Sequence, residues 1–198
     1  MTAMTILDDP DRTAPVPLAT GRLGMRLLLA SLGMLFAACV SGLLYVRSIA
    51  KVWPPEGMPS LPTGLWLSTV ILLVSSATVQ WAVSAARHDE QPGIRYGLLA
   101  TFLLGVAFLV SQTVNWFVLV AAAFTPKVNL YAFTYYLLTG LHALHVLGGL
   151  VPVGVVTARA FRGDYSAARR SGVEYAAMYW HFLDVVWVVL FIVLYLAG

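Results

Sequence analysis

Five long stretches of this 198-residue chain contain almost no charged residue. They lie between Arg26 and Arg47, Glu56 and Arg87, Arg95 and Lys127, Lys127 and Arg159, and from Glu174 to the C-terminus. Each can supply the ~20 residues that a helix needs to cross ~30 Å of hydrocarbon. Only 11% of the residues are charged, whereas a soluble domain carries about 25%. The sequence therefore predicts an all-α fold, a polytopic membrane helix bundle of five transmembrane helices.

Two segments of unequal length follow from this pattern. Residues 1–21 carry several Asp and Pro residues and lack the basic start and cleavage site of a signal peptide. We predict a disordered cytoplasmic tail over 1–21 and a five-helix transmembrane domain over 22–198.

The fourth uncharged stretch is longer than one span needs. We therefore expect it to tilt, to kink at Pro152, or to begin with a non-helical segment.

The basic residues are unevenly divided between the two sides of the predicted bundle. One side carries Arg12, Arg22, Arg26, Arg87, Arg95, Arg159, Arg162, Arg169 and Arg170; the other carries Arg47, Lys51 and Lys127. Because cytoplasmic loops are enriched in Lys and Arg, we predict that the N-terminus is cytoplasmic and the C-terminus outside. The total net charge of +3 gives no indication of nucleic-acid binding.

Three ionisable residues, Glu174, His181 and Asp184, lie in the last stretch. A charged group at bilayer depth costs roughly 2.5–3.5 kcal/mol on insertion scales, so it persists where partners or a function compensate. At 100° per residue the three positions fall within about 80° of one another, on a face that must look at protein. We expect His181 and Asp184 to form a local pair that fixes the imidazole tautomer. Glu174, near Arg169 and Arg170, should pair with a basic group.

Two histidines, His142 and His145, lie three residues apart in the fourth stretch, among Gly140, Gly148 and Gly149. Small residues allow another helix to approach closely. The histidines could make structural hydrogen bonds, ligate haem or bind a metal. Cys39 is the only cysteine, so a disulfide within the chain and a cysteine metal cage are both excluded.

Two amides, Gln112 and Asn115, are neighbours on one face of the third stretch. Amides in membrane helices usually bond between helices, which is the interpretation we favour over an ion or proton path. The sequence contains no nucleophile–base pair, phosphate loop or zinc-protease motif. We therefore expect no catalysis by this chain alone.

Two motifs stand in a characteristic order: Thr139-Gly-Leu-His-Ala-Leu-His-Val146, then Tyr179-Trp-His-Phe-Leu-Asp-Val-Val-Trp187. With Glu174, Gln112, Arg22-Leu-Gly-Met25, Trp53-Pro-Pro55 and Leu67-Ser-Thr-Val-Ile-Leu-Leu-Val-Ser-Ser76, they resemble subunit III of the haem–copper oxidases. That family comprises cytochrome c oxidase and its quinol-oxidase relatives. The resemblance runs from about Arg22 to Leu196. Many members have seven helices, and five corresponds to a shorter form.

The resemblance implies a non-catalytic subunit of a proton-pumping terminal oxidase, which reduces oxygen to water in aerobic respiration. Such a subunit packs directly on subunit I, has subunit II in the same complex, supports proton uptake and binds phospholipid. Haem and copper are expected in subunits I and II, with no cofactor in this chain, and the location is a bacterial plasma membrane. The implied structural and lipid-binding polar residues are Glu174, His181, Asp184, His142, His145, Arg169, Arg170, Gln112 and Asn115. Arg169 and Arg170 could hold phospholipid headgroups.

Two positions depart from the family pattern. Leu32 follows Ser31 where the first shared helix usually has Ser-Glu, and Asn115 stands where the third helix usually has a glutamate. A contribution of those acids to proton uptake cannot be carried over to this chain.

Other functions remain open on the residues alone. One is a haem-b membrane anchor of a dehydrogenase, with His142 or His145 paired to His181. Another is a small transporter, for which the sequence shows no convincing inverted repeat. The electron donor (cytochrome c or quinol), the haem type and an association with nitric oxide reductase are also left open.

Overall fold

The computed structural model of the chain describes residues 18–53, 55 and 62–197. Within them the regular structure is five helices: α1 (Leu18–Ile49), α2 (Gly64–Arg87), α3 (Gln91–Ala121), α4 (Leu130–Phe161) and α5 (Ser171–Ala197). All five are long and apolar enough to cross a membrane. The prediction of an all-α bundle with five spans is confirmed.

The helix boundaries differ from the charge-free stretches in identifiable ways. Helix α1 begins at Leu18, so residues 18–21, which we assigned to the tail, belong to the first helix. The rest of the predicted tail lies outside the described residues. Helix α4 begins at Leu130, where the side chain of Asn129 accepts a hydrogen bond from the Ala132 amide at 2.8 Å. The expected non-helical start after Lys127 is therefore present, while Pro152 lies inside the helix.

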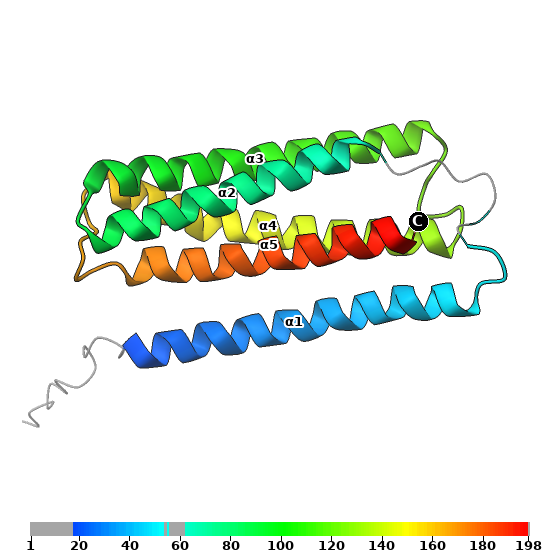
Figure 1. Ribbon diagram of the computed structural model, residues 1–198, viewed down its shortest axis with the longest axis horizontal. Coiled ribbons are helices and arrows are strands. Elements are labelled where there is room, and N and C mark those ends of the chain that lie inside the picture. Colours follow the sequence, from blue (N-terminus) through cyan, green and yellow to red (C-terminus); the bar gives the residue numbers. More distant parts are fainter. Residues whose placement is uncertain (1–17, 54, 56–61, 198) are drawn as a thin grey trace, which may run out of the picture.

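Helices α2 to α5 form a closed four-helix arrangement, and α1 lies outside it (Figure 1). Helix α2 packs on α3 and α5, and α4 packs on α3 and α5. Helix α1 packs only on α4 and α5 among the described helices. Most α1 side chains are exposed, whereas the inner faces of the other four helices form the core.

Glycines allow close helix contacts, at one place that we expected and at two that we did not. A Cβ atom at Gly97 would lie 2.9 Å from the Cβ of Ala82, and one at Gly93 would lie 2.6 Å from the Cβ of Ala85, so α2 and α3 approach backbone to backbone. A Cβ at Gly149 would meet the Tyr179 ring at 2.7 Å, as predicted for a packing glycine. At Gly140 and Gly148 no described atom lies within 4 Å of a Cβ position, so these two glycines are not packing sites.

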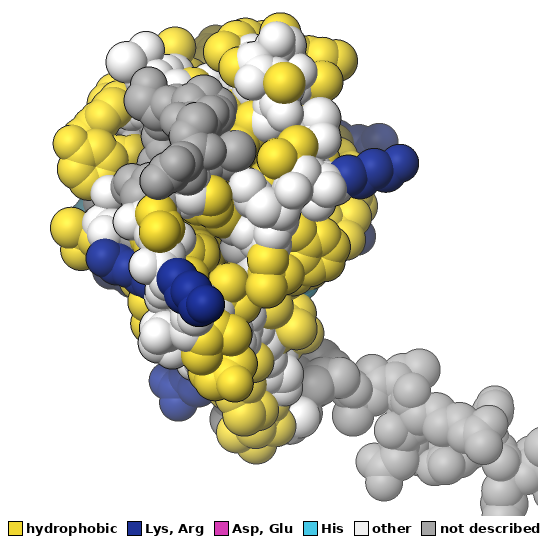
Figure 2. All heavy atoms as spheres, turned by 90° about the vertical axis from the view of Figure 1, so that its right-hand side faces the viewer, with side chains coloured by type: hydrophobic (Ala, Val, Ile, Leu, Met, Phe, Trp, Pro, Cys, Tyr) yellow, Lys and Arg dark blue, Asp and Glu magenta, His cyan; other side chains and the backbone are white. Residues whose placement is uncertain are grey.

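The alternating helix directions bring eight arginines to one end of the bundle, here called the arginine-rich end. These are Arg22, Arg26, Arg87, Arg95, Arg159, Arg162, Arg169 and Arg170. Figure 2 looks onto the opposite end, where hydrophobic side chains cover much of the visible surface and Lys or Arg side chains stand at its edges. The charge asymmetry predicted from the loops is therefore a property of the folded bundle.

Candidate functional site

At the arginine-rich end, Glu174 joins three segments of the chain. Its carboxylate accepts a hydrogen bond from Arg22 of α1 at 2.9 Å and another from Arg170 of the α4–α5 loop at 2.8 Å. The Glu174 side chain is only 16% exposed. The expectation that Glu174 pairs with a basic group is confirmed, and Arg22 is a partner that the local sequence did not reveal. This pair ties the start of α1 to α5.

Arg169 and Arg170, which we expected to act alike, have different surroundings. The Arg170 guanidinium bonds to Glu174 and to the backbone oxygen of Ala167. Arg169 is exposed, and its backbone amide donates to the Ser166 oxygen at 2.9 Å. Of these two neighbouring arginines, Arg169 is therefore the exposed one, whereas Arg170 is engaged by Glu174.

About two turns further along α5, the side chain of His181 contacts two side chains of helix α2. Its Nδ1 lies 2.8 Å from the Ser76 hydroxyl, and its Nε2 lies 3.2 Å from Oε1 of Gln80. Because an amide oxygen accepts, this arrangement places the imidazole proton on Nε2 and lets Ser76 donate to Nδ1. Oδ2 of Asp184 is 3.7 Å from Nδ1, beyond hydrogen-bonding distance. The predicted i,i+3 pair is thus a close contact, and side chains of α2 rather than Asp184 fix the tautomer.

Two tryptophans of α5 continue this connection to α2. The indole N–H of Trp180 donates to the Ser75 hydroxyl, and that of Trp187 donates to the Thr69 hydroxyl, each at 3.0 Å. Both tryptophans are fully buried. Our sequence reasoning missed these contacts. The available signal was the set of small hydroxyl residues spaced along α2, which alone does not name a partner.

The two histidines of α4 do not act as a pair. His142 is fully buried, with its ring 5.7 Å from that of Phe108 and 5.1 Å from that of Trp187. Neither of its ring nitrogens has a hydrogen-bond partner within the described residues. His145 is half-buried, and its Nδ1 donates to the Leu141 backbone oxygen at 2.7 Å. The structural interpretation thus fits His145, while His142 packs among aromatic rings.

The amides of α3 also separate in role. Asn115 donates to the Ser68 hydroxyl of α2 at 3.3 Å, so it bonds between helices as expected. Gln112 is fully buried, but its amide has no hydrogen-bond partner among the residues that the structure describes. A hydroxyl pair, Ser68 and Ser111 at 2.8 Å, adds a second polar link between α2 and α3.

Taken together, these contacts connect helices. The polar contacts described above join α5 to α2 and α1, and α3 to α2. Two further hydrogen bonds reach α4, from the Tyr179 hydroxyl to the His145 backbone oxygen and from the Trp116 indole to the Thr139 hydroxyl, each at 3.2 Å. Across residues 18–53, 55 and 62–197, no group of three or more His, Cys, Asp and Glu side chains is placed to hold a metal ion. The arrangement can bind the helices to one another and present charge at one end of the bundle.

Comparison with known proteins identifies the family. The profile described as "Cytochrome c oxidase subunit III" matches residues 13–198, which include all five helices. The chain belongs to the cytochrome c oxidase subunit III family. It is thus a multi-pass membrane protein of the cytochrome c oxidase complex.

Individual subunit III relatives support the same assignment. "Cytochrome c oxidase subunit 3" of Synechocystis sp. is 38% identical over 175 residues, covering 87% of this chain and 74% of the relative. The protein of the same name in Thermostichus vulcanus is 33% identical over 178 residues, covering 88% and 86%. That of Corynebacterium diphtheriae is 39% identical over 127 residues, covering 64% and 62%. The resemblance drawn from the two motifs of α4 and α5 is confirmed.

Proposed function

We propose that this chain is the non-catalytic subunit III of a proton-pumping terminal oxidase. It packs directly on subunit I, with subunit II in the same complex. Haem and copper reside in those two subunits, where oxygen is reduced to water, and this chain carries no cofactor. The single observation that carries the proposal is the family match over residues 13–198.

The contacts of the histidines support a structural role over haem ligation. His181 is held by Ser76 and Gln80, while His142 lies against Phe108 and Trp187. The two imidazoles therefore have different surroundings: that of His181 lies on the α2 side of α5, and that of His142 lies inside the aromatic core. A bis-histidine haem site would require both rings to face one cofactor.

Two roles within the complex belong to the proposal. The subunit supports proton uptake into subunit I, and it binds phospholipid through basic residues at the arginine-rich end, Arg169 among them. The location is a bacterial plasma membrane with the N-terminus cytoplasmic and the C-terminus outside. The number of arginines at one end of the bundle supports that orientation.

The proposed function is tested by purifying the tagged full chain in mild detergent. We expect a reduced-minus-oxidised haem spectrum, copper and oxygen uptake to co-purify with the chain, and to be lost once it is stripped from its partners. Haem b that remains with the stripped chain would contradict the proposal and identify a haem-carrying anchor. Assays with reduced cytochrome c and with a quinol distinguish the electron donor.

The proton-uptake role needs its own comparison. Oxygen reduction by the complex is measured with and without this subunit as the pH is raised. If the subunit supports proton uptake, the turnover of the depleted complex should begin to fall at a lower pH than the turnover of the intact complex. Identical pH profiles would show that proton uptake does not depend on this chain.

A further inference from the structure

Two fully buried polar side chains in the four-helix core, Gln112 of α3 and His142 of α4, lack hydrogen-bond partners. Both amide atoms of Gln112 and both ring nitrogens of His142 are unpartnered within the part of the chain that the structure describes. Buried polar groups of native proteins are nearly always hydrogen-bonded, either to protein or to ordered water. A buried group without a partner costs free energy, because its bonds to bulk water are lost and nothing replaces them.

The register of α3 and α4 brings these two side chains to one level of the bundle. The Trp116 indole of α3 donates to the Thr139 hydroxyl of α4 at 3.2 Å, so these two positions are level. The two helices run in opposite directions (Figure 1). Four residues back along α3 is therefore level with four residues on along α4, which pairs Gln112 with position 143. His142 is one residue from that position, or about 1.5 Å along the helix axis.

Both side chains also lie on inward faces of their helices. At 100° per residue, position 112 is about 20° from position 105 and about 40° from position 116. Both of those residues contact α4, since a Cβ at Gly105 would lie 2.8 Å from Leu150 and Trp116 bonds to Thr139. On α4, position 142 is about 20° from Gly149, which meets α5. Gln112 therefore faces α4, and His142 lies between α3 and α5.

Aromatic rings from three helices surround the imidazole of His142. Its ring centroid lies 5.7 Å from that of Phe108, 5.1 Å from that of Trp187 and 6.2 Å from that of Phe36. The Trp187 indole N–H already donates to the Thr69 hydroxyl. These rings exclude bulk solvent from the level that Gln112 and His142 share, and none of them partners the unpartnered atoms.

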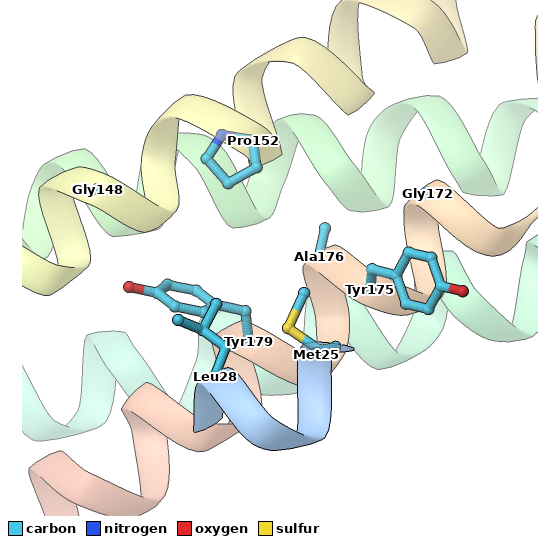
Figure 3. Close-up of a pocket in the computed structure, with 8 residues that line it drawn as sticks. All are labelled: Met25, Leu28, Gly148, Pro152, Gly172, Tyr175, Ala176 and Tyr179. Carbon is cyan, nitrogen blue, oxygen red and sulfur yellow. The ribbon is translucent and has the colours of Figure 1, made fainter. Parts of the chain in front are cut away.

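The open hollow beside α1 does not supply the partners either. It has a volume of about 330 Å³, and its lining is mainly apolar, with Met25, Leu28 and Pro152 among the residues that Figure 3 shows. Neither Gln112 nor His142 is among its lining residues. The two unpartnered side chains thus belong to the interior of the bundle.

The chemistry of the two side chains indicates what can bind between them. The Gln112 amide offers one acceptor oxygen and a donor nitrogen, and a neutral imidazole offers one donor and one acceptor. A bound cation would satisfy only the acceptors, and a bound anion only the donors. Water both donates and accepts, and a buried water typically makes about three hydrogen bonds. The pair of side chains therefore suits a neutral molecule that does both.

We propose that α3 and α4 hold a buried water molecule between the Gln112 amide and the His142 imidazole. No direct hydrogen bond joins these two side chains, although they lie at one level of the core. The water links α3 to α4 about one turn along α3 from the direct Trp116–Thr139 bond. This site goes beyond the proposed function and does not depend on it.

The test is X-ray hydroxyl-radical footprinting of the full chain purified in its complex. Radicals formed from water oxidise the side chains beside it, and mass spectrometry identifies the oxidised residues. His142, Phe108 and Trp187 should be oxidised although all three are fully buried. Trp180 is the internal control, because it is equally buried, lies about two turns along α5 from Trp187 and donates to Ser75. It should remain unoxidised.

Variants then assign the water to its site. Gln112→Leu keeps a similar volume and removes both amide atoms, so oxidation of Phe108 and Trp187 should fall to that of Trp180. The matched control Ser111→Ala removes a hydroxyl of α3 that bonds to Ser68, and it should keep the wild-type pattern. An unoxidised wild type would overturn the proposal. So would equal oxidation of the wild type and Gln112→Leu.

A second variant and a map protect the test against misfolding. His142→Phe keeps an aromatic ring and removes both nitrogens, so oxidation of Trp187 should fall here too. If neither variant assembles, a high-resolution cryo-EM map of the wild-type complex decides. Density for water between Gln112 and His142 supports the site, and a direct bond between the two side chains refutes it. Haem and copper are measured in the same sample, so failure of the oxidase assignment is recognised separately.

Discussion

Replacing Gly97 by alanine should loosen the contact between α2 and α3. The new Cβ would lie 2.9 Å from the Cβ of Ala82 and 3.1 Å from both its Cα and its backbone nitrogen. Carbon atoms prefer a separation of about 3.5–4.0 Å. Two of the three clashing atoms belong to the α2 backbone, so no side-chain rotation relieves them. The helices themselves must move apart.

The expected cost follows from overpacking. Extra atoms in a packed core cost about 1–3 kcal/mol. At about 2–4 °C per kcal/mol for a chain of this size, the midpoint of thermal unfolding should fall by roughly 2–12 °C. The measurement is the fraction of purified full chain that remains monodisperse by size exclusion after heating in detergent.

Gly140→Ala is the matched control on α4. No described atom lies within 4 Å of its Cβ position, and alanine is favoured over glycine inside a helix by roughly 0.5–1 kcal/mol. This control should be unchanged or slightly more stable. If Gly97→Ala proves as stable as Gly140→Ala, the close approach of α2 and α3 is not what stabilises this pair of helices.

Three further outcomes are expected. Trp187→Phe and Thr69→Val should each destabilise the chain, because each removes one partner of the 3.0 Å indole hydrogen bond. A double-mutant cycle should give a coupling energy of about 0.5–1.5 kcal/mol between the two positions. Additive effects of the two substitutions would contradict that bond. Burial raises the pKa of the Tyr165 phenol above its usual 10.0. The folded state therefore disfavours ionisation of Tyr165. The contribution of its neutral phenol to the free energy of unfolding is fully present below pH 10, and it is lost as the pH rises through the pKa of the folded state. Tyr165→Phe should accordingly flatten the loss of thermal stability above pH 10, and an unchanged alkaline profile would oppose it. A carbodiimide should leave α1 unlabelled, because Leu32 stands where the family usually has a glutamate, and peptide mapping should place any α5 label at Glu174 or Asp184; label recovered on α1 would refute this.

The arrangement of charged residues in sequence was sufficient to predict several features. Five spans follow from five uncharged stretches, because hydrophobic length is a local property that the bilayer thickness constrains. The polar face of α5 follows from the helical period, which places Glu174 and His181 on one side whatever the neighbours are. The pairing of Glu174 with Arg170 follows in the same way, since residues four apart are neighbours on a helix surface.

The partners across helices could not be predicted in this way. Trp187 donates to Thr69 from 118 residues away, and Arg22 reaches Glu174 across 152. His181 lies near Asp184, as its spacing predicts, yet its hydrogen bonds go to α2. Such choices depend on which helix faces lie together, and lipid-facing and protein-facing apolar residues look alike in a sequence. The sequence alone thus determined how many helices cross the membrane and which of their faces are polar. Only the tertiary structure decided which side chains on neighbouring helices bond to those polar faces, and that α1 packs on α4 and α5 alone among the described helices.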